Sequence, residues 1–229
     1  MSLASLAQPQ NRRGGRRLGL WLLAATPFML AACSDFERQA GQQLSALSTS
    51  SADPVMAPAP LPSYRPGQSF RFSDGQSLRV VSSDAGRVVW RDQDGGQRVT
   101  ARNFVVPTLE AAGMERAVVN DAGGLWPLQV GKSDRMRIAR TKVEPNGVRV
   151  SQGARNYNCR VSNTERITVA AGSYETYRVQ CNRFSNSGKR LVETRVWHYA
   201  PAVGHFVRRD DIDRKTGWRE RVELVGLSG

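Results

Sequence analysis

Two histidines, His198 and His205, are the residues from which a metal centre or a general base would be built. A zinc site based on two histidines needs further ligands, and the chain has neither an H-x-H nor an H-x-x-x-H spacing. Asp210, Asp211 and Asp213 follow along the chain, but strand alternation does not bring them and both rings together. The sequence therefore predicts no metal site and no cofactor.

Motifs for nucleophilic catalysis and for phosphate binding are incomplete. A hydrolase that uses a strand-to-helix nucleophile turn carries Gly-x-Ser-x-Gly, which this sequence lacks. Val130-Gly131-Lys132-Ser133 has the end of a phosphate-binding loop, but Trp126 stands where that loop needs its first glycine. We therefore predict a protein without catalytic residues, and a cell-wall or lipid-metabolising hydrolase is the alternative.

The N-terminus has the layout of a secretory signal. Arginines at positions 12, 13, 16 and 17 precede an apolar run from Leu18 to Met29, which is too short to span a bilayer comfortably. The next residues, Leu30-Ala31-Ala32-Cys33, resemble the lipobox of bacterial lipoproteins, in which the cysteine receives a diacylglycerol. The resemblance implies that residues 1–32 are removed and that Cys33 is lipidated. An uncleaved helix is the alternative, against which Pro27 argues.

The expected partner at this end of the chain is a membrane, because two or three acyl chains on one cysteine hold a protein stably. In enteric lipoproteins, aspartate directly after the cysteine retains the protein in the inner membrane, whereas this chain has Ser34. The resemblance therefore implies a lipid-anchored protein of the outer membrane that faces the periplasm. Inner-membrane attachment is the alternative.

The net charge of +13 falls to +9 without residues 1–32, and a basic chain raises the question of nucleic-acid binding. Export removes the protein from cytoplasmic DNA and RNA, so we predict no nucleic-acid partner. From Ser48 to Pro66 the composition turns to serine, alanine and proline, which is typical of an extended linker. Residues 33–66 are thus predicted to be a lipidated, disordered tether, and residues 67–229 a single domain.

Alternating apolar and polar residues with frequent turn signals run through residues 67–229. Ser73-Asp74-Gly75 and Asp94-Gly95-Gly96 each indicate a tight hairpin between two short strands. The segment Pro107–Arg116 is the one predicted helix, with proline at its start. About ten antiparallel strands and one short helix define an all-β fold, either a curved sheet, a β-sandwich or a barrel.

Cys159 and Cys181 remain as a pair if Cys33 carries lipid. In the oxidising periplasm such a pair is usually a structural disulfide. Each cysteine alternates with apolar residues along its predicted strand, which suits a cross-link between neighbouring strands. A redox motif would need Cys-x-x-Cys spacing, which is absent. We therefore predict a Cys159–Cys181 disulfide.

Aromatic residues gather in the second half of the chain, mostly at alternating positions. Core packing explains most of them, and the functional alternative is an apolar cavity that holds a lipid or an acyl chain. The candidate residues for this apolar ligand face are Tyr157, Tyr177, Trp197, Tyr199 and Phe206.

Two segments of this half, Ile167–Val179 and Val196–Arg209, resemble a pattern in proteobacterial envelope proteins of unknown function. The shared residues are turn glycines, a proline and core aromatics, so the resemblance implies an antiparallel β domain in the envelope and carries over no catalytic residues. The expected function is non-catalytic: an apolar ligand carrier, or a component of envelope assembly and maintenance. A lipid or an envelope protein is the expected partner.

Overall fold

The computed structural model describes residues 56–84, 86–120 and 123–229, and the predicted signal peptide and Cys33 lie outside these ranges. No helix of the described residues is long and apolar enough to cross a membrane. Within the described ranges the elements are β1 (Ser69–Phe72), β2 (Ser77–Ser83), β3 (Arg87–Asp92), β4 (Gln97–Ala101), β5 (Glu110–Ala111), β6 (Met114–Asn120), the 3₁₀ helix η1 (Gly123–Leu125), β7 (Ser133–Val143), β8 (Arg149–Val169), β9 (Gly172–Phe184), β10 (Leu191–Ala200), β11 (His205–Asp213) and β12 (Arg219–Ser228).

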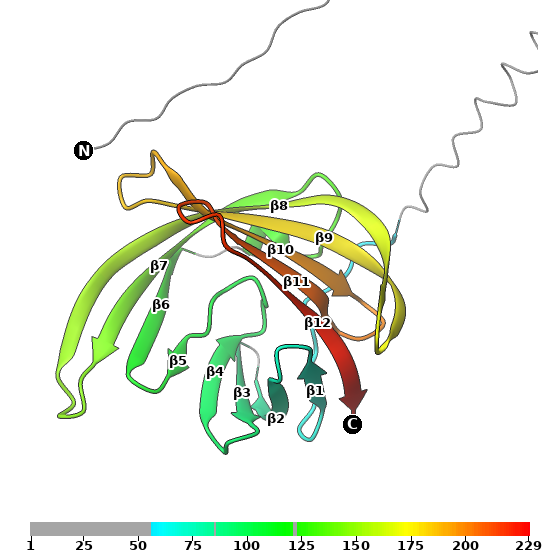
Figure 1. Ribbon diagram of the computed structural model, residues 1–229, viewed down its shortest axis with the longest axis horizontal. Coiled ribbons are helices and arrows are strands. Elements are labelled where there is room, and N and C mark those ends of the chain that lie inside the picture. The colour runs from blue at the N-terminus through cyan, green and yellow to red at the C-terminus, as the bar shows by residue number, and fades with distance from the viewer. Residues whose placement is uncertain (1–55, 85, 121–122) are drawn as a thin grey trace, which may run out of the picture. The chain divides into compact units, whose positions relative to one another are not determined.

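The strands close into a barrel in which every strand pairs antiparallel with its neighbours in sequence (Figure 1). β1 pairs with β12 to complete the circle, and Ser69 lies opposite Ser228 with 2.7 Å between the two hydroxyl oxygens. Closure pairs β1 with β12, the two strands that would otherwise be the edges of an open sheet. Of the three all-β architectures that the sequence allows, the barrel is the one formed.

The β1–β2 and β3–β4 hairpins form where the sequence predicts them. Gly75 and Gly95 adopt φ angles of 85° and 82°, and this left-handed conformation is the reason for glycine in these tight turns. Trp90 of β3 donates a hydrogen bond from Nε1 to Thr100 Oγ1 of β4 at 2.8 Å, which ties the second hairpin together on its inner face.

The predicted helix over Pro107–Arg116 is wrong. Glu110 and Ala111 form β5, and Ala111 lies opposite Met114 at the start of β6. Gly113 has a φ angle of 70°, so it closes a turn between the two strands instead of extending a helix. Propensity is a weak prior here, and strand pairing inside the closed sheet overrides it.

The second half of the barrel has the longest strands. Residues 149–169 form the single 21-residue strand β8. Ala139 pairs with Ala154 and Thr141 with Ser151, so two residues of β8 face Arg140 alone. This is a β-bulge, which bends a strand without ending it.

Residues 56–66, predicted as the end of the tether, pack against the barrel. Ala59 and Leu128 exchange two backbone hydrogen bonds, at 3.0 and 2.7 Å. Tyr177 directs its hydroxyl at the carbonyl oxygens of Met56 and Ala57, at 2.9 and 2.6 Å. The predicted tether is therefore too long, since this segment belongs to the folded unit. We call residues 56–66 the strap.

The core fills the barrel interior with aromatic and β-branched side chains. His205 lies among the rings of Tyr64, Phe70, Phe72 and Trp90, with centroid separations between 4.6 and 5.9 Å. Burial of each large apolar side chain contributes roughly 1.5–3 kcal/mol, and edge-to-face ring pairs add to this. The aromatic cluster positions the cavity described below.

Candidate functional site

The structure bonds Cys159 of β8 to Cys181 of β9, the pair predicted from the sequence. The two residues lie directly opposite each other in the strand register, and both face the barrel interior, with exposed fractions of 2 and 3%. Closing a loop with a sequence separation of 22 contributes about 3 kcal/mol in the chain-entropy model. The disulfide therefore fixes the two longest strands of the sheet against each other.

The five aromatic residues of the candidate ligand face do not form one surface. Trp197 and Phe206 line an interior cavity, with ring centroids 4.8 Å apart. Tyr199 is stacked on Phe104 at 5.1 Å and belongs to the core. Tyr177 is fully buried and bonds the strap, whereas Tyr157 lies in a separate surface groove. Of these five candidate residues, Trp197 and Phe206 are the two that line the cavity.

The cavity has a volume of about 140 Å³ and lies inside the barrel. For comparison, an engineered protein cavity of about 150 Å³ holds one benzene molecule. Its apolar walls come from the strap, the first four strands, the loop after β4 and the last three strands; they include Tyr64, Phe72, Leu78, Trp90, Phe104, Val106, Trp197, Phe206 and Val222. A cavity of this size and lining fits a phenyl ring or a short alkyl group.

One side of the cavity carries charged side chains. Arg98, Arg195 and Arg209 contribute to its lining, and the last two place their guanidinium carbons 5.4 and 5.6 Å from the ring centroid of Trp197. Asp211 accepts hydrogen bonds from Arg195 Nε and from Arg209 Nε, the latter at 2.8 Å. The cavity therefore combines an aromatic wall with a charged one, as a site for an amphiphile requires.

The two histidines face opposite sides of the sheet. His205 lines the cavity, where burial lowers its pKa to about 3 and its Nδ1 lies 3.0 Å from the Tyr64 hydroxyl. His198 faces an outer groove, with Nδ1 3.4 Å from Glu165 Oε1. Burial is the main cause that lowers its pKa to about 4. Both rings are neutral at pH 7, and they do not converge on one ion.

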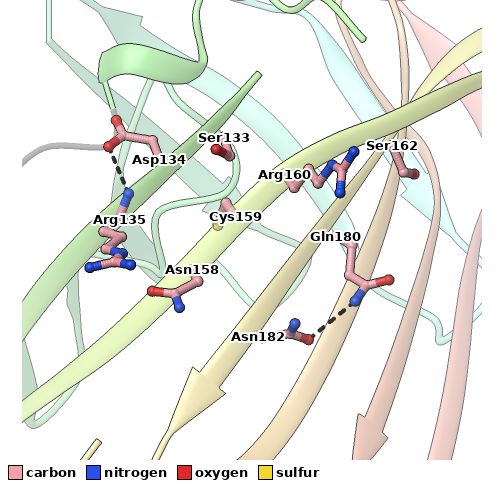
Figure 2. Close-up of a pocket in the computed structure, with 9 residues that line it drawn as sticks. All are labelled: Ser133, Asp134, Arg135, Asn158, Cys159, Arg160, Ser162, Gln180 and Asn182. Atoms are coloured by element: carbon pink, nitrogen blue, oxygen red, sulfur yellow. Dashed lines mark hydrogen bonds between the residues drawn. The ribbon is translucent and has the colours of Figure 1, made fainter. Parts of the chain in front are cut away.

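A second groove, of about 910 Å³, lies over the disulfide on β7, β8 and β9 (Figure 2). Its one carboxylate, Asp134, accepts backbone N–H groups of Gly124 and Arg135 at 2.8 and 2.6 Å. Gln180 donates to Asn182 Oδ1 at 3.4 Å (Figure 2). The lining is amides, hydroxyls and arginines, which suits hydrogen bonding and offers no pair of groups for proton transfer.

The residues predicted to form an apolar ligand face include none from the N-terminal half of the cavity wall. Phe70 and Phe72 alternate on β1, and Val88 and Trp90 alternate on β3, so period-two patterning was present in this half as well. Tyr64 had no such signal, because it lies in a proline-rich segment that reads as linker.

The fold and cavity together define a closed antiparallel β-barrel with a small amphiphilic interior site. No protein-family model matches the chain, and no curated protein matches it. The chain is similar at low identity to solved structures that include the following three. The hypothetical lipoprotein YmcC from Escherichia coli is 12% identical with a TM-score of 0.45, over 89% of this chain and 100% of that chain.

A Bacteroides fragilis protein with a YmcC-like fold is 15% identical with a TM-score of 0.45, over 75% of this chain and 100% of that chain. A Parabacteroides distasonis protein is 12% identical with a TM-score of 0.42, over 77% of this chain and 100% of that chain. None of the three is similar enough to assign this chain to a family.

Proposed function

We propose that this protein is a lipid-anchored protein of the bacterial outer membrane, facing the periplasm, that binds a small apolar group in its barrel and does not transform it. The observation that carries the proposal is the cavity of about 140 Å³ between Trp90, Phe104 and Trp197. A closed, disulfide-linked barrel is a rigid scaffold, so the cavity is formed before a ligand arrives.

The anchor follows from the lipobox and the strap supports it. Cys33 holds the membrane end, and the strap joins the segment after Cys33 to the barrel through Tyr177 and Leu128. The strap also carries Tyr64, which forms part of the cavity wall. The strap is thus part of the binding site.

Substitution of Cys33 by serine tests the anchor. Cys33→Ser should abolish incorporation of labelled palmitate and release the protein from the membrane fraction. Membrane fractionation that stays unchanged, with no loss of label, would contradict a lipid anchor at Cys33.

Binding of phenol by the full chain tests the cavity. The chain is kept in a non-ionic, phosphate-free detergent, and saturation-transfer NMR reports contact between phenol and protein. Leu78→Phe adds a ring at the cavity wall and should reduce phenol binding by about tenfold or more. Phenol signals equal to those of micelles alone would contradict a binding cavity.

A further inference from the structure

Three arginines face the barrel interior beside the cavity and form what we call the arginine cluster: Arg116, Arg140 and Arg155. Arg116 of β6 lies directly opposite Arg140 of β7. Arg155 of β8 lies opposite Ile138 of β7. Ile138 is a buried core residue two positions before Arg140 on β7. Because side chains alternate between the two faces of a strand, Arg140 and Arg155 point to the side where Ile138 is buried.

The cluster is not neutralised by the protein. None of the three arginines forms an ion pair within residues 56–84, 86–120 and 123–229. Burial lowers the pKa of Arg116, and the charge of Arg140 lowers it further. Burial also lowers the pKa of Arg155, followed by the charges of Arg183 and Arg140. These groups therefore repel one another in a partly desolvated position.

Hydrogen bonding in the cluster is also incomplete. Arg140 Nε is buried without a hydrogen-bond partner among the described residues. Arg116 donates one bond, from Nη1 to the carbonyl oxygen of Thr108 at 2.6 Å. A buried donor without an acceptor is unfavourable, so an anion that accepts a hydrogen bond from Arg140 Nε would be bound favourably.

Two carboxylates of β10 and β11 are engaged by other arginines. Glu193 accepts from Arg183 Nη2 at 2.8 Å, and Asp211 accepts from Arg195 and Arg209. Neither carboxylate forms an ion pair with Arg116, Arg140 or Arg155. Among the described residues, the arginine cluster therefore keeps its positive charge.

Two residues link the arginine cluster to the cavity. Thr108, whose carbonyl oxygen holds Arg116, also lines the cavity. Arg195 lines the cavity as well, and its charge acts on Arg116. A single ligand with an anionic end and an apolar end can occupy both places.

We propose that the arginine cluster binds a phosphate group, and that the ligand of the barrel is a phosphorylated amphiphile whose apolar end enters the cavity. A phosphate brings up to two negative charges and several acceptor oxygens, which suits three forked guanidiniums better than the single charge of a carboxylate. This inference rests on the proposed ligand-binding function. The phosphate belongs either to a lipid headgroup or to a soluble phosphate ester.

Comparing the binding of phenyl phosphate with that of phenol tests the arginine cluster separately from the cavity in the full chain. Phenyl phosphate should bind more tightly than phenol, by about tenfold or more, because it carries the phosphate group. The double variant Arg140→Gln/Arg155→Gln should remove this gain and leave phenol binding unchanged. Phenyl phosphate that binds no better than phenol to the wild type would overturn the arginine cluster while leaving the proposed function in place.

Two exposed arginines on the opposite face of the same strands, Arg137 of β7 and Arg160 of β8, give a matched control. Arg137→Gln/Arg160→Gln makes the same change in net charge and should retain the gain from phosphate. An equal loss in the control would assign the effect to surface charge and overturn the proposal. Thermal unfolding provides a second readout, because removal of mutually repelling charges should leave the double cluster variant at least as stable as the wild type.

Leu78→Phe distinguishes failure of the cavity from failure of the cluster. Inorganic phosphate should still bind this variant, whereas phenol should not. Loss of inorganic phosphate binding in Leu78→Phe with its retention in Arg140→Gln/Arg155→Gln would overturn the cluster as the phosphate site. Binding of soluble dihexanoyl phosphatidic acid shows whether the phosphate belongs to a lipid headgroup or to a soluble ester. Binding tighter than that of phenyl phosphate supports a lipid headgroup, and equal or weaker binding supports a soluble ester.

Discussion

The guanidinium carbon of Arg195 lies 5.4 Å from the ring centroid of Trp197, on the same strand and the same face. Both residues line the cavity, so a charged group and an aromatic ring form one continuous wall. Arg195 is held in place by Asp211, which is buried at an exposed fraction of 5%. Asp211 therefore holds two of the arginines of the charged wall, Arg195 and Arg209.

Asp211→Asn should destabilise the fold by about 3 kcal/mol, because it leaves two partly buried guanidiniums, Arg195 and Arg209, without their shared counter-charge. Denaturant unfolding measures the change. Glu220→Gln is the control, since Glu220 contacts Arg209 at 3.6 Å from a more exposed position. A loss in Asp211→Asn no larger than that in Glu220→Gln would contradict the structural role of Asp211.

Removal of the disulfide should cost stability without unfolding the barrel. The variant Cys159→Ala/Cys181→Ala should lose about 3 kcal/mol, which corresponds to a fall in Tm of roughly 6–12 °C for a domain of this size. In the unreduced wild type, Cys159 and Cys181 should resist alkylation until a reductant is added. Prompt alkylation without reductant would show that the bond is absent in the exported protein.

His205 should make the barrel sensitive to mild acid. Burial lowers its pKa from the ordinary value near 6.5 to about 3, so the unfolded chain takes up a proton before the folded chain does. Stability is therefore complete above about pH 6.5 and declines as the pH falls toward 3.

His205→Phe keeps an aromatic ring in the cluster and removes the titrating group. Its free energy of unfolding should fall less than that of the wild type between pH 7 and pH 4.5, by up to about 1.4 kcal/mol per pH unit. Tyr64→Phe is the control, because it deletes the same hydrogen bond and leaves the histidine. Parallel pH curves for wild type and His205→Phe would refute the contribution of His205.

Tyr177→Phe should release the strap. The lost hydroxyl contacts the carbonyl oxygens of Met56 and Ala57, so the cost is about 1 kcal/mol and limited proteolysis near residue 57 should accelerate. Tyr174→Phe is matched to it on β9, since the Tyr174 hydroxyl bonds only the nearby carbonyl oxygen of Ala171 at 2.7 Å. Equal cleavage rates in the two variants would argue against the strap contact.

The all-β fold was predictable because alternation and turn glycines are local signals. The dipeptides Asp74-Gly75 and Asp94-Gly95 each predict a hairpin turn. The Cys159–Cys181 disulfide is predicted from the alternating apolar pattern of two strands. Barrel closure was not predictable in the same way. It depends on the pairing of β1 with β12, whose partners Ser69 and Ser228 lie at opposite ends of the domain.

The cavity was predictable only in part, because residues that are far apart in the sequence form its wall. Trp197 and Phe206 stood out as aromatics on predicted strands, but Phe104 lies in a loop and Tyr64 in a proline-rich segment. Arg116 was hidden in a segment that reads as a helix. Its position opposite Arg140 exists only once Gly113 turns the chain into a strand pair.

Native mass spectrometry of the full chain, extracted gently from membranes, tests most directly whether the barrel is a ligand-binding protein. We predict a bound species of a few hundred daltons on the wild type, with a mass defect typical of a phosphate ester. It should be reduced or lost in Leu78→Phe. A clean ligand-free mass for the wild type, or a bound species that persists unchanged in Leu78→Phe, would contradict binding in the interior cavity.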